Sequence, residues 1–428
     1  MQQLPLVATG RPGPWGLVAP AFLLALSGWL AAAVALLASG DALARVATWD
    51  DWLVLAVHFT GLVLFPFAVA GGAWHALPPM LRNSLRRPRV LRGTLVLMLG
   101  SIPLAAGVAL DVAWLGAVGS LMLVVALALV AASIAGVVLG APAGRTLVAG
   151  RTGIALAIFH AVLAFALGAA LFGGDGDLLG MARDRLLLVH FTLAAVGWLA
   201  VLLLSVGRVL DPMLALAAAP GKRRFPLQEV AVVVTLWPAL IGVALGILPL
   251  ALAGTVGLTA ALAPFGLAMV RAGIRGRIGL REGPLAHVLI GGVSIVQGGL
   301  VALAGLGGLL DERRAATAYG VLLVGGFAAG ILVGHAGKLL ALSAWANWPP
   351  GPRPKQVSLY PRRVWQLEAT LFLVAVQLLA AGTLLDGPSV VRAGELVLVA
   401  AAVSAVAGAL LTLRSVFRAE NAPSLAVR

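Results

Sequence analysis

The sequence has 428 residues, 61% of them hydrophobic and 11% charged, a composition that excludes a soluble globular domain and indicates an integral membrane protein. The formal net charge of +14 does not indicate nucleic-acid binding, because the basic residues lie in short connections beside apolar runs, where membrane topology and anionic headgroups account for them. The lack of cysteine excludes disulfides, iron–sulfur clusters and thiolate-bound metals.

Twelve apolar segments are long enough to cross a bilayer as helices. They cover roughly residues 16–39, 52–75, 93–112, 114–140, 152–174, 186–210, 228–248, 250–272, 285–309, 316–342, 364–384 and 393–413. The first follows a Pro- and Gly-rich leader without an evident cleavage site, which favours a retained span over a removed signal peptide. No linker separates two domains. The sequence therefore predicts an all-α integral membrane protein, with residues 1–428 forming a single polytopic domain in contact with the lipid bilayer.

The connections between the predicted spans alternate in charge. Basic residues follow the even-numbered spans: Arg82, Arg86, Arg87, Arg89, Arg92, Arg145, Arg151, Lys222, Arg223, Arg224, Arg275, Arg277, Arg281, Arg353, Lys355, Arg362 and Arg363. The other connections carry Asp50, Asp51, Asp111, Asp175, Asp177 and Asp386, except for a neutral one at 311–314. Since basic loops stay inside, we expect a multi-pass protein of the inner (cytoplasmic) membrane with both termini in the cytoplasm.

Two stretches of the chain echo each other. One begins with His-Phe-Thr at His58 and the other with His-Phe-Thr at His190, and both close on Pro-Met-Leu. A looser third copy surrounds His335 in span ten. These echoes predict a twelve-helix bundle with pseudo-threefold blocks of four helices near 1–146, 147–282 and 283–428. The alternative is a chance alignment of apolar helices.

Two histidines lie one to two turns inside the outer ends of spans two and six. Histidine is costly inside a bilayer, so the repeated placement of His58 and His190 makes both candidates for binding a haem or a metal. The alternative is that each is an inherited residue hydrogen-bonded to a neighbouring helix.

A second group of polar residues lies near the cytoplasmic ends of the spans. Its members are His75, Arg208, His287, His335 and Lys338. The group is a candidate site for an anion, a metal or a haem propionate, or a set of interfacial residues whose polar ends reach the headgroups. Gln297 and Gln377, mid-span in spans nine and eleven, are candidates for an interhelical hydrogen bond.

A histidine early in span two, followed by a Gly-Gly pair, an aromatic residue and a proline, resembles subunit I of the haem-copper oxidases. His58, Gly71, Gly72, Trp74 and Pro79 carry this pattern. The segment "HFTLAAVGWLAVLLLSVGRVLDPM" resembles helices of the cbb3-type and nitric oxide reductase branch of that family. The resemblance implies twelve helices in three blocks, cytoplasmic termini, and other respiratory or haem-protein subunits as partners.

The resemblance also implies roles for individual residues. His58 matches an axial ligand of the low-spin haem, and His190 matches one of three copper ligands. Span seven should supply a His-His pair, but it contains Trp237 and Pro238 and no histidine. Span ten should supply a His-X-His near its outer end, where this chain has Tyr319. Because metal affinity depends on ligand count, terminal oxidase or reductase activity is not expected, and whether the chain is an enzyme stays open.

Three functions follow from these observations. The first is a haem-copper-oxidase-like protein without a complete haem-copper centre, which binds haem b, copper or both in an electron-transfer, nitric-oxide or metal-handling role. The second is a cofactor-free scaffold or accessory subunit of a respiratory membrane complex. The third is a secondary transporter, which the scarcity of charges at mid-membrane and the threefold echo disfavour.

Overall fold

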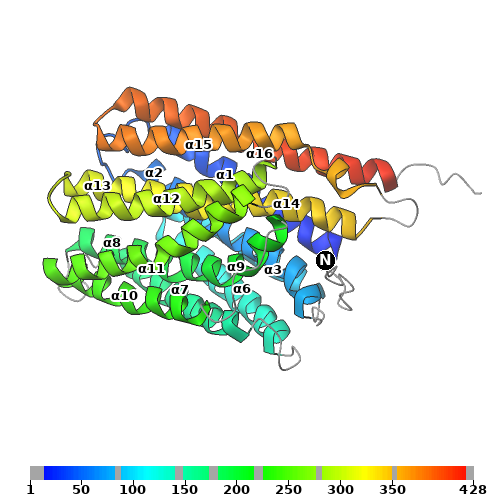
Figure 1. Cartoon of the computed structure of the whole chain (residues 1–428), viewed down its shortest axis with the longest axis horizontal. Helices are drawn as coiled ribbons and strands as arrows, with labels where there is room; N and C mark the ends of the chain where they lie inside the picture. The colour runs from blue at the N-terminus through cyan, green and yellow to red at the C-terminus, as the bar shows by residue number, and fades with distance from the viewer. Residues whose placement is uncertain are drawn as a thin grey trace, which may run out of the picture.

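The computed structural model of the protein describes residues 14–81, 88–139, 148–172, 182–215, 225–275, 282–348 and 354–420. Within these ranges the chain is almost entirely helical and has no strand, and the helices lie side by side along the long axis of the molecule (Figure 1). This arrangement agrees with the predicted all-α class, since a membrane-spanning helix satisfies every backbone hydrogen bond within itself.

The helices follow the predicted spans in order. In the described ranges they are α1 (Trp15–Ala38), α2 (Asp51–His58), η1 (Phe59–Leu64), α3 (Phe65–Leu81), α4 (Pro88–Met98), α5 (Ser101–Ala109), α6 (Ala113–Leu139), α7 (Val148–Phe172), α8 (Arg183–Thr192), η3 (Leu193–Ala200), α9 (Val201–Ala215), α10 (Phe225–Leu245), α11 (Leu248–Arg275), α12 (Gly283–Leu306), α13 (Glu312–Gly320), η6 (Val321–Ala329), α14 (Gly330–Ala346), η7 (Gln356–Leu359), α15 (Arg362–Leu384) and α16 (Pro388–Glu420). Here η1, η3 and η6 are π-helical segments inside continuous helices, and η7 is a 3-10 turn.

Within the described residues, eleven helices are long and apolar enough to cross a membrane. The predicted fifth span falls in α7, whose described apolar part, Thr152–Gly168, is shorter. The predicted third span is interrupted by a turn at 99–100, which separates α4 from α5. The helical membrane bundle is therefore confirmed, whereas the count of twelve spans and the division into three blocks stay predictions.

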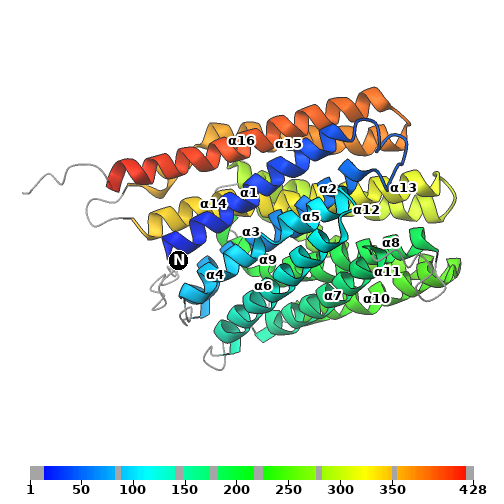
Figure 2. The same ribbon diagram turned by 180° about the vertical axis from the view of Figure 1, so that it is seen from behind.

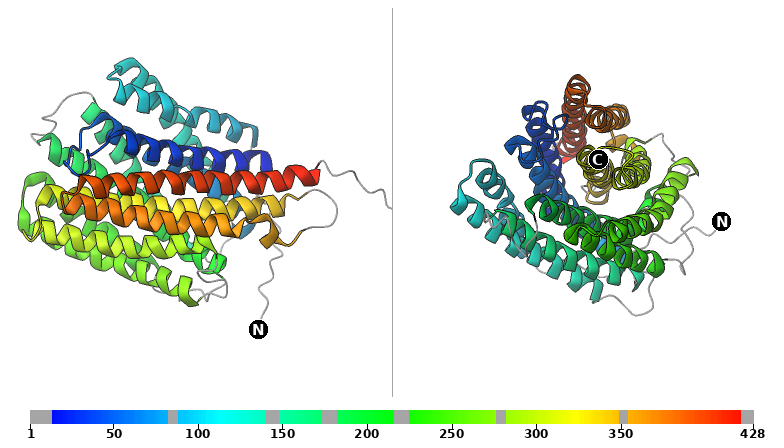
Figure 3. Two further views of the ribbon diagram at one scale, coloured as in Figure 1. Left: turned by 90° about the horizontal axis from the view of Figure 1, so that it is seen from above. Right: turned by 90° about the vertical axis from the view of Figure 1, so that its left-hand side faces the viewer.

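The described chain begins and ends at the same end of the bundle (Figures 1 and 2). We call this the terminal end and the opposite one the far end. In the end-on view of Figure 3 the helices follow one another around the bundle, and the circuit closes where α16 packs against α1. His58 and His190 consequently lie toward the far end, whereas His75, His287, His335 and Lys338 lie toward the terminal end.

Small residues allow neighbouring helices to approach closely. A Cβ built on Gly107 of α5 would fall 2.3 Å from the backbone nitrogen of Gly116 in α6, and one built on Gly254 of α11 would fall 2.1 Å from the backbone nitrogen of Ala239 in α10. Lipid tails are as apolar as the helices, so close van der Waals packing is a principal source of association in this environment. Large side chains such as Leu121 and Val234 are exposed, as lipid-facing residues would be.

At the far end, Arg314 makes polar contacts to three residues from other segments of the chain. Its guanidinium donates to the carbonyl oxygens of Ala44 (3.0 Å) and Thr383 (3.1 Å) and forms an ion pair with Asp386 (2.9 Å). The preceding Asp311 caps α13 by accepting from the backbone N–H of Arg314 at 2.9 Å. The neutral 311–314 connection therefore joins the loop after α1 to the end of α15.

Candidate functional site

The far-end histidines are each held by one ring nitrogen. His58 is the last residue of α2, and its Nδ1 lies 2.7 Å from the carbonyl oxygen of Val54, one turn earlier. His190 lies in α8, and its Nδ1 lies 2.8 Å from the carbonyl oxygen of Ala164 in the neighbouring α7. A carbonyl oxygen only accepts, so Nδ1 carries the proton in both neutral rings and Nε2 carries the free lone pair. Neither Nε2 has a hydrogen-bond partner among the described residues.

The backbone leaves space for the His190 ring. A Cβ built on Gly168 of α7 would fall 2.9 Å from Cε1 of His190. The absence of a side chain at this position therefore lets the imidazole lie against α7, where it reaches Ala164. The two histidines are also close enough to interact electrostatically. His58 and His190 thus lie in one region of the bundle.

A π-helical segment follows each of three residues near the far end, namely His58, His190 and Tyr319. Such segments begin one residue after His58, three residues after His190 and two residues after Tyr319. The third, η6, packs against both η1 and η3, and the ring of Tyr319 meets that of Phe191 edge-on with centroids 6.5 Å apart. π-helical turns are rare and occur frequently at functional sites. The described residues therefore contain three of them at matching places in spans two, six and ten.

The described residues hold no group of three or more His, Cys, Asp or Glu placed to bind a metal. In span seven, Trp237 of α10 packs against His160 of α7 with ring centroids 5.9 Å apart. His160 is fully buried, and its Nδ1 donates one hydrogen bond to the carbonyl oxygen of Leu156 at 2.7 Å. An aromatic contact thus lies between α7 and α10 at this position.

The predicted polar group at the terminal end separates into pairs. His287 of α12 pairs with Glu368 of α15, and Lys338 of α14 pairs with Glu282, which immediately precedes α12. Neither glutamate belongs to the predicted polar group, and neither pairing was predicted from the sequence. Only the placement of Glu368 about one turn inside its span signalled that it lies within the bundle.

The other predicted members of that group lie elsewhere. His335 of α14 is buried, with Nδ1 2.7 Å from the carbonyl oxygen of Ile331. His75 of α3 is buried, and its Nδ1 has no hydrogen-bond partner in the described part of the chain. The side chain of Arg208 lies outside the described residues.

Aromatic rings lie beside the two pairs. Phe372 lies against the His287 ring, with centroids 4.8 Å apart. Tyr360 stacks on Trp365 at 6.1 Å with an interplanar angle of 9°, and Nζ of Lys338 lies 5.7 Å from the centroid of the Tyr360 ring. Burial, reinforced by the charges of two nearby glutamates, raises the pKa of the Tyr360 phenol, so this hydroxyl keeps its proton.

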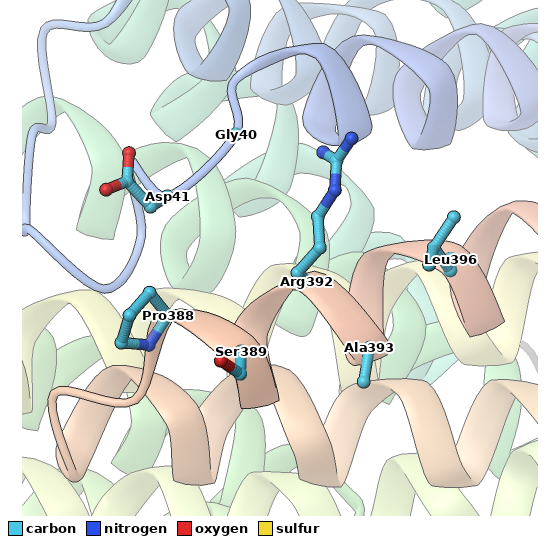
Figure 4. A pocket seen from close by; sticks show the side chains of 7 residues that line it. All are labelled: Gly40, Asp41, Pro388, Ser389, Arg392, Ala393 and Leu396. Atoms are coloured by element: carbon cyan, nitrogen blue, oxygen red, sulfur yellow. The ribbon is translucent and has the colours of Figure 1, made fainter.

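A shallow hollow of about 540 Å³ lies at the far end, between the loop after α1 and the start of α16 (Figure 4). Arg392 rises from α16 beside it and donates to the carbonyl oxygen of Leu37 at the end of α1, which satisfies part of the helix C-terminus. Asp41 points away from Arg392 and instead pairs with Arg45 at 2.7 Å. The hollow is therefore lined by groups that stabilise the helix ends.

No protein-family model matches the chain, and no curated protein matches it. The resemblance to haem-copper oxidase subunit I therefore depends on the motifs of the sequence.

Among the other polar residues, the predicted interhelical contact of Gln297 and Gln377 is present as two reciprocal amide hydrogen bonds of 3.2 and 3.1 Å.

Proposed function

We propose that the chain is a multi-pass protein of the inner membrane with cytoplasmic termini, related to haem-copper oxidase subunit I but lacking a complete haem-copper centre. His58 and His190 bind haem b, copper or both, and the protein acts in electron transfer, nitric-oxide handling or metal handling. Other respiratory or haem-protein subunits are the expected partners. The terminal end is the cytoplasmic one, because the connections rich in Lys and Arg join the helices there.

The observation that carries the proposal is the hydrogen bonding of the two imidazoles, which protonates Nδ1 and leaves the lone pair of Nε2 free. Ligand histidines commonly donate one ring N–H to a carbonyl oxygen, which fixes the tautomer and leaves the other nitrogen for the metal. His58 and His190 both have this arrangement, and each is followed by a π-helical segment. Imidazole nitrogen suits both haem iron and copper, so these residues fit either group.

The residues of spans seven and ten support a site with fewer ligands than the family's haem-copper centre has. The positions of the remaining family ligands hold Trp237, Pro238 and Tyr319. Two imidazoles can supply axial ligands to haem iron, or two of the nitrogens that bind copper. When bound, the group supplies a one-electron couple. The chain's own part is to orient the two rings and keep Nδ1 protonated through Val54 and Ala164.

The experiment is a reduced-minus-oxidised spectrum with metal analysis of the purified protein from cells replete in haem and copper. The wild type should contain stoichiometric haem or copper, and the His58→Ala, His190→Ala double variant should lose it. His75→Ala is the matched control, because it removes a histidine roughly 25 Å further along the same span. A colourless, metal-free wild type would contradict the proposal.

Two alternatives have different outcomes in the same experiment. A cofactor-free scaffold or accessory subunit would yield the colourless wild type and would co-purify with respiratory subunits. Secondary transport is favoured by one observation, the buried pairs of His287 with Glu368 and Lys338 with Glu282, since transporters hold ionisable groups inside the bundle. It predicts a solute or ion flux that does not depend on His58.

A further inference from the structure

The pair of His287 and Glu368 is fully enclosed. Both side chains have 0% exposure, and they join α12 to α15 through a hydrogen bond between Nε2 of His287 and Oε2 of Glu368. One proton shared between these atoms gives either imidazolium with carboxylate or imidazole with carboxylic acid. Both forms keep the same hydrogen bond between Nε2 and Oε2.

Each partner also has a second polar atom directed into the interior. Nδ1 of His287 and Oε1 of Glu368 are both buried without a hydrogen-bond partner among the described residues. A buried polar atom in this state is costly, and most such atoms in native proteins find a partner. Nδ1 can hold or release a proton, and Oε1 can accept one. The pair can therefore change its protonation state without breaking its own hydrogen bond.

Tyr360 lies between this pair and the terminal end. Its hydroxyl is buried, has no hydrogen-bond partner in the described part of the chain, and is close enough to both Glu282 and Glu368 to feel their charges. Its ring stacks on Trp365, one turn before Glu368 in α15. The hydroxyl is thus a neutral group in the same region that can both donate and accept a hydrogen bond.

The pair of Lys338 and Glu282 is the third protonatable group in this region, after the His287–Glu368 pair and Tyr360. Its side chains are 9% and 13% exposed, so it lies nearer the surface than the fully enclosed pair. Glu282 and His287 are five residues apart at the start of α12, a separation of about 7.5 Å along the helix axis. Protonatable groups therefore run from the partly exposed pair through Tyr360 to the enclosed pair.

We propose that His287 and Glu368 form a buried proton-binding site that is loaded from the terminal end through Lys338, Glu282 and Tyr360. Uptake of one proton from water converts the shared-proton pair into imidazolium facing a carboxylic acid, and release of that proton by the same route restores it. The site gains one positive charge on loading and no other bond changes.

Few other charged groups face this site. The elements packed around it contribute Glu282 from the start of α12, His335 and Lys338 from α14, and Tyr360 before α15. At the same end, α11 carries the exposed Arg271 and Arg275, and α15 begins with the exposed Arg362 and Arg363. α1 and η6 contain no charged residue, and α16 has none between Glu395 and Arg414. The surroundings of Glu368 are otherwise apolar, with Phe372 one turn along α15 packed against the His287 ring.

The test is infrared difference spectroscopy of the full chain in lipid nanodiscs, between a high and a low pH. Wild type should give the carbonyl stretch of a buried carboxylic acid, shifted in D2O, and Glu368→Gln should remove it. Glu395→Gln controls for other buried carboxyl groups, because Glu395 is also fully buried but lies toward the far end beside Arg392. It should remove only the contribution of Glu395 and leave the band that the Glu368 variants alter. Glu368→Asp, which keeps the carboxyl, should move the band. If both Glu368 variants leave the spectrum unchanged, the site is wrong.

The proton route is tested separately by the rate at which the carbonyl band changes after a pH jump. Tyr360→Phe should keep the amplitude and slow the change by about a hundredfold, the low end of what a positioned proton donor contributes. An unchanged rate would overturn the role of Tyr360. The measurement uses one fixed redox state, so its outcome is distinguishable from failure of the haem or copper proposal.

Discussion

His58 and His190 at the far end have a different kind of hydrogen-bond partner from His287 at the terminal end. At the far end, His58 and His190 bond to backbone carbonyl oxygens, so each ring keeps a free nitrogen and no charge is involved. At the terminal end, His287 and Lys338 bond to carboxylates from other elements. The comparison teaches that a backbone carbonyl oxygen fixes the tautomer of a histidine without adding a titratable partner, whereas a glutamate adds a second group that can hold a proton.

Breaking the enclosed pair should give the largest effect. Glu368→Leu leaves an imidazole buried without its partner, which we expect to lower the free energy of unfolding by about 3–5 kcal/mol. The His287→Leu, Glu368→Leu double variant removes both polar groups and should recover much of that loss. Denaturant-induced unfolding in detergent, followed by helical circular dichroism, measures both. Equal losses in the single and double variants would show that packing, not pairing, dominates here.

Filling the space beside His190 tests the far end. Gly168→Val adds atoms where a Cβ already falls 2.9 Å from the His190 ring, so the ring must leave Ala164. We expect a loss of about 1–3 kcal/mol from overpacking together with loss of bound haem or copper in the reduced-minus-oxidised spectrum. Gly136→Ala is the control, since a Cβ there meets nothing within 4 Å. Retention of full cofactor content by Gly168→Val would separate His190 from the binding site.

Removing the anchor at the far end should have a smaller effect. Arg314→Met removes the contacts to Ala44, Thr383 and Asp386, and we expect it to lower the free energy of unfolding by about 1–2 kcal/mol because the side chain is partly exposed. Its neighbour Arg313 provides the matched control, since it is 81% exposed and its ion pair with Asp184 is 3.9 Å long. Arg313→Met should change stability by less than about 0.5 kcal/mol. Equal effects in thermal unfolding would remove the special role of Arg314.

Much of the architecture followed from apolar run lengths, while the pairings did not. Helix positions were predictable because a bilayer requires about 20 apolar residues per helix. The partnership of His287 and Glu368 was not, because the residues are far apart in sequence and only the packing of α12 on α15 brings them together. The π-helical segments also left no compositional signal, although the His-Phe-Thr echo marked where two of them begin.

Breaking the amide pair of Gln297 and Gln377 should have the smallest effect on the free energy of unfolding. It tests whether a neutral polar pair contributes as much to the α12–α15 contact as the pair that contains Glu368. Gln297 and Gln377 exchange two hydrogen bonds between α12 and α15, the same two helices that His287 and Glu368 join. Interhelical hydrogen bonds in membranes average about 0.6 kcal/mol, because an unpaired amide in the unfolded state also finds partners. Gln297→Leu should therefore cost about that much in the unfolding assay, several times less than Glu368→Leu. If the two variants were equally destabilising, the α12–α15 contact would depend on polar pairing in general, and the charge of Glu368 would lose its distinct role.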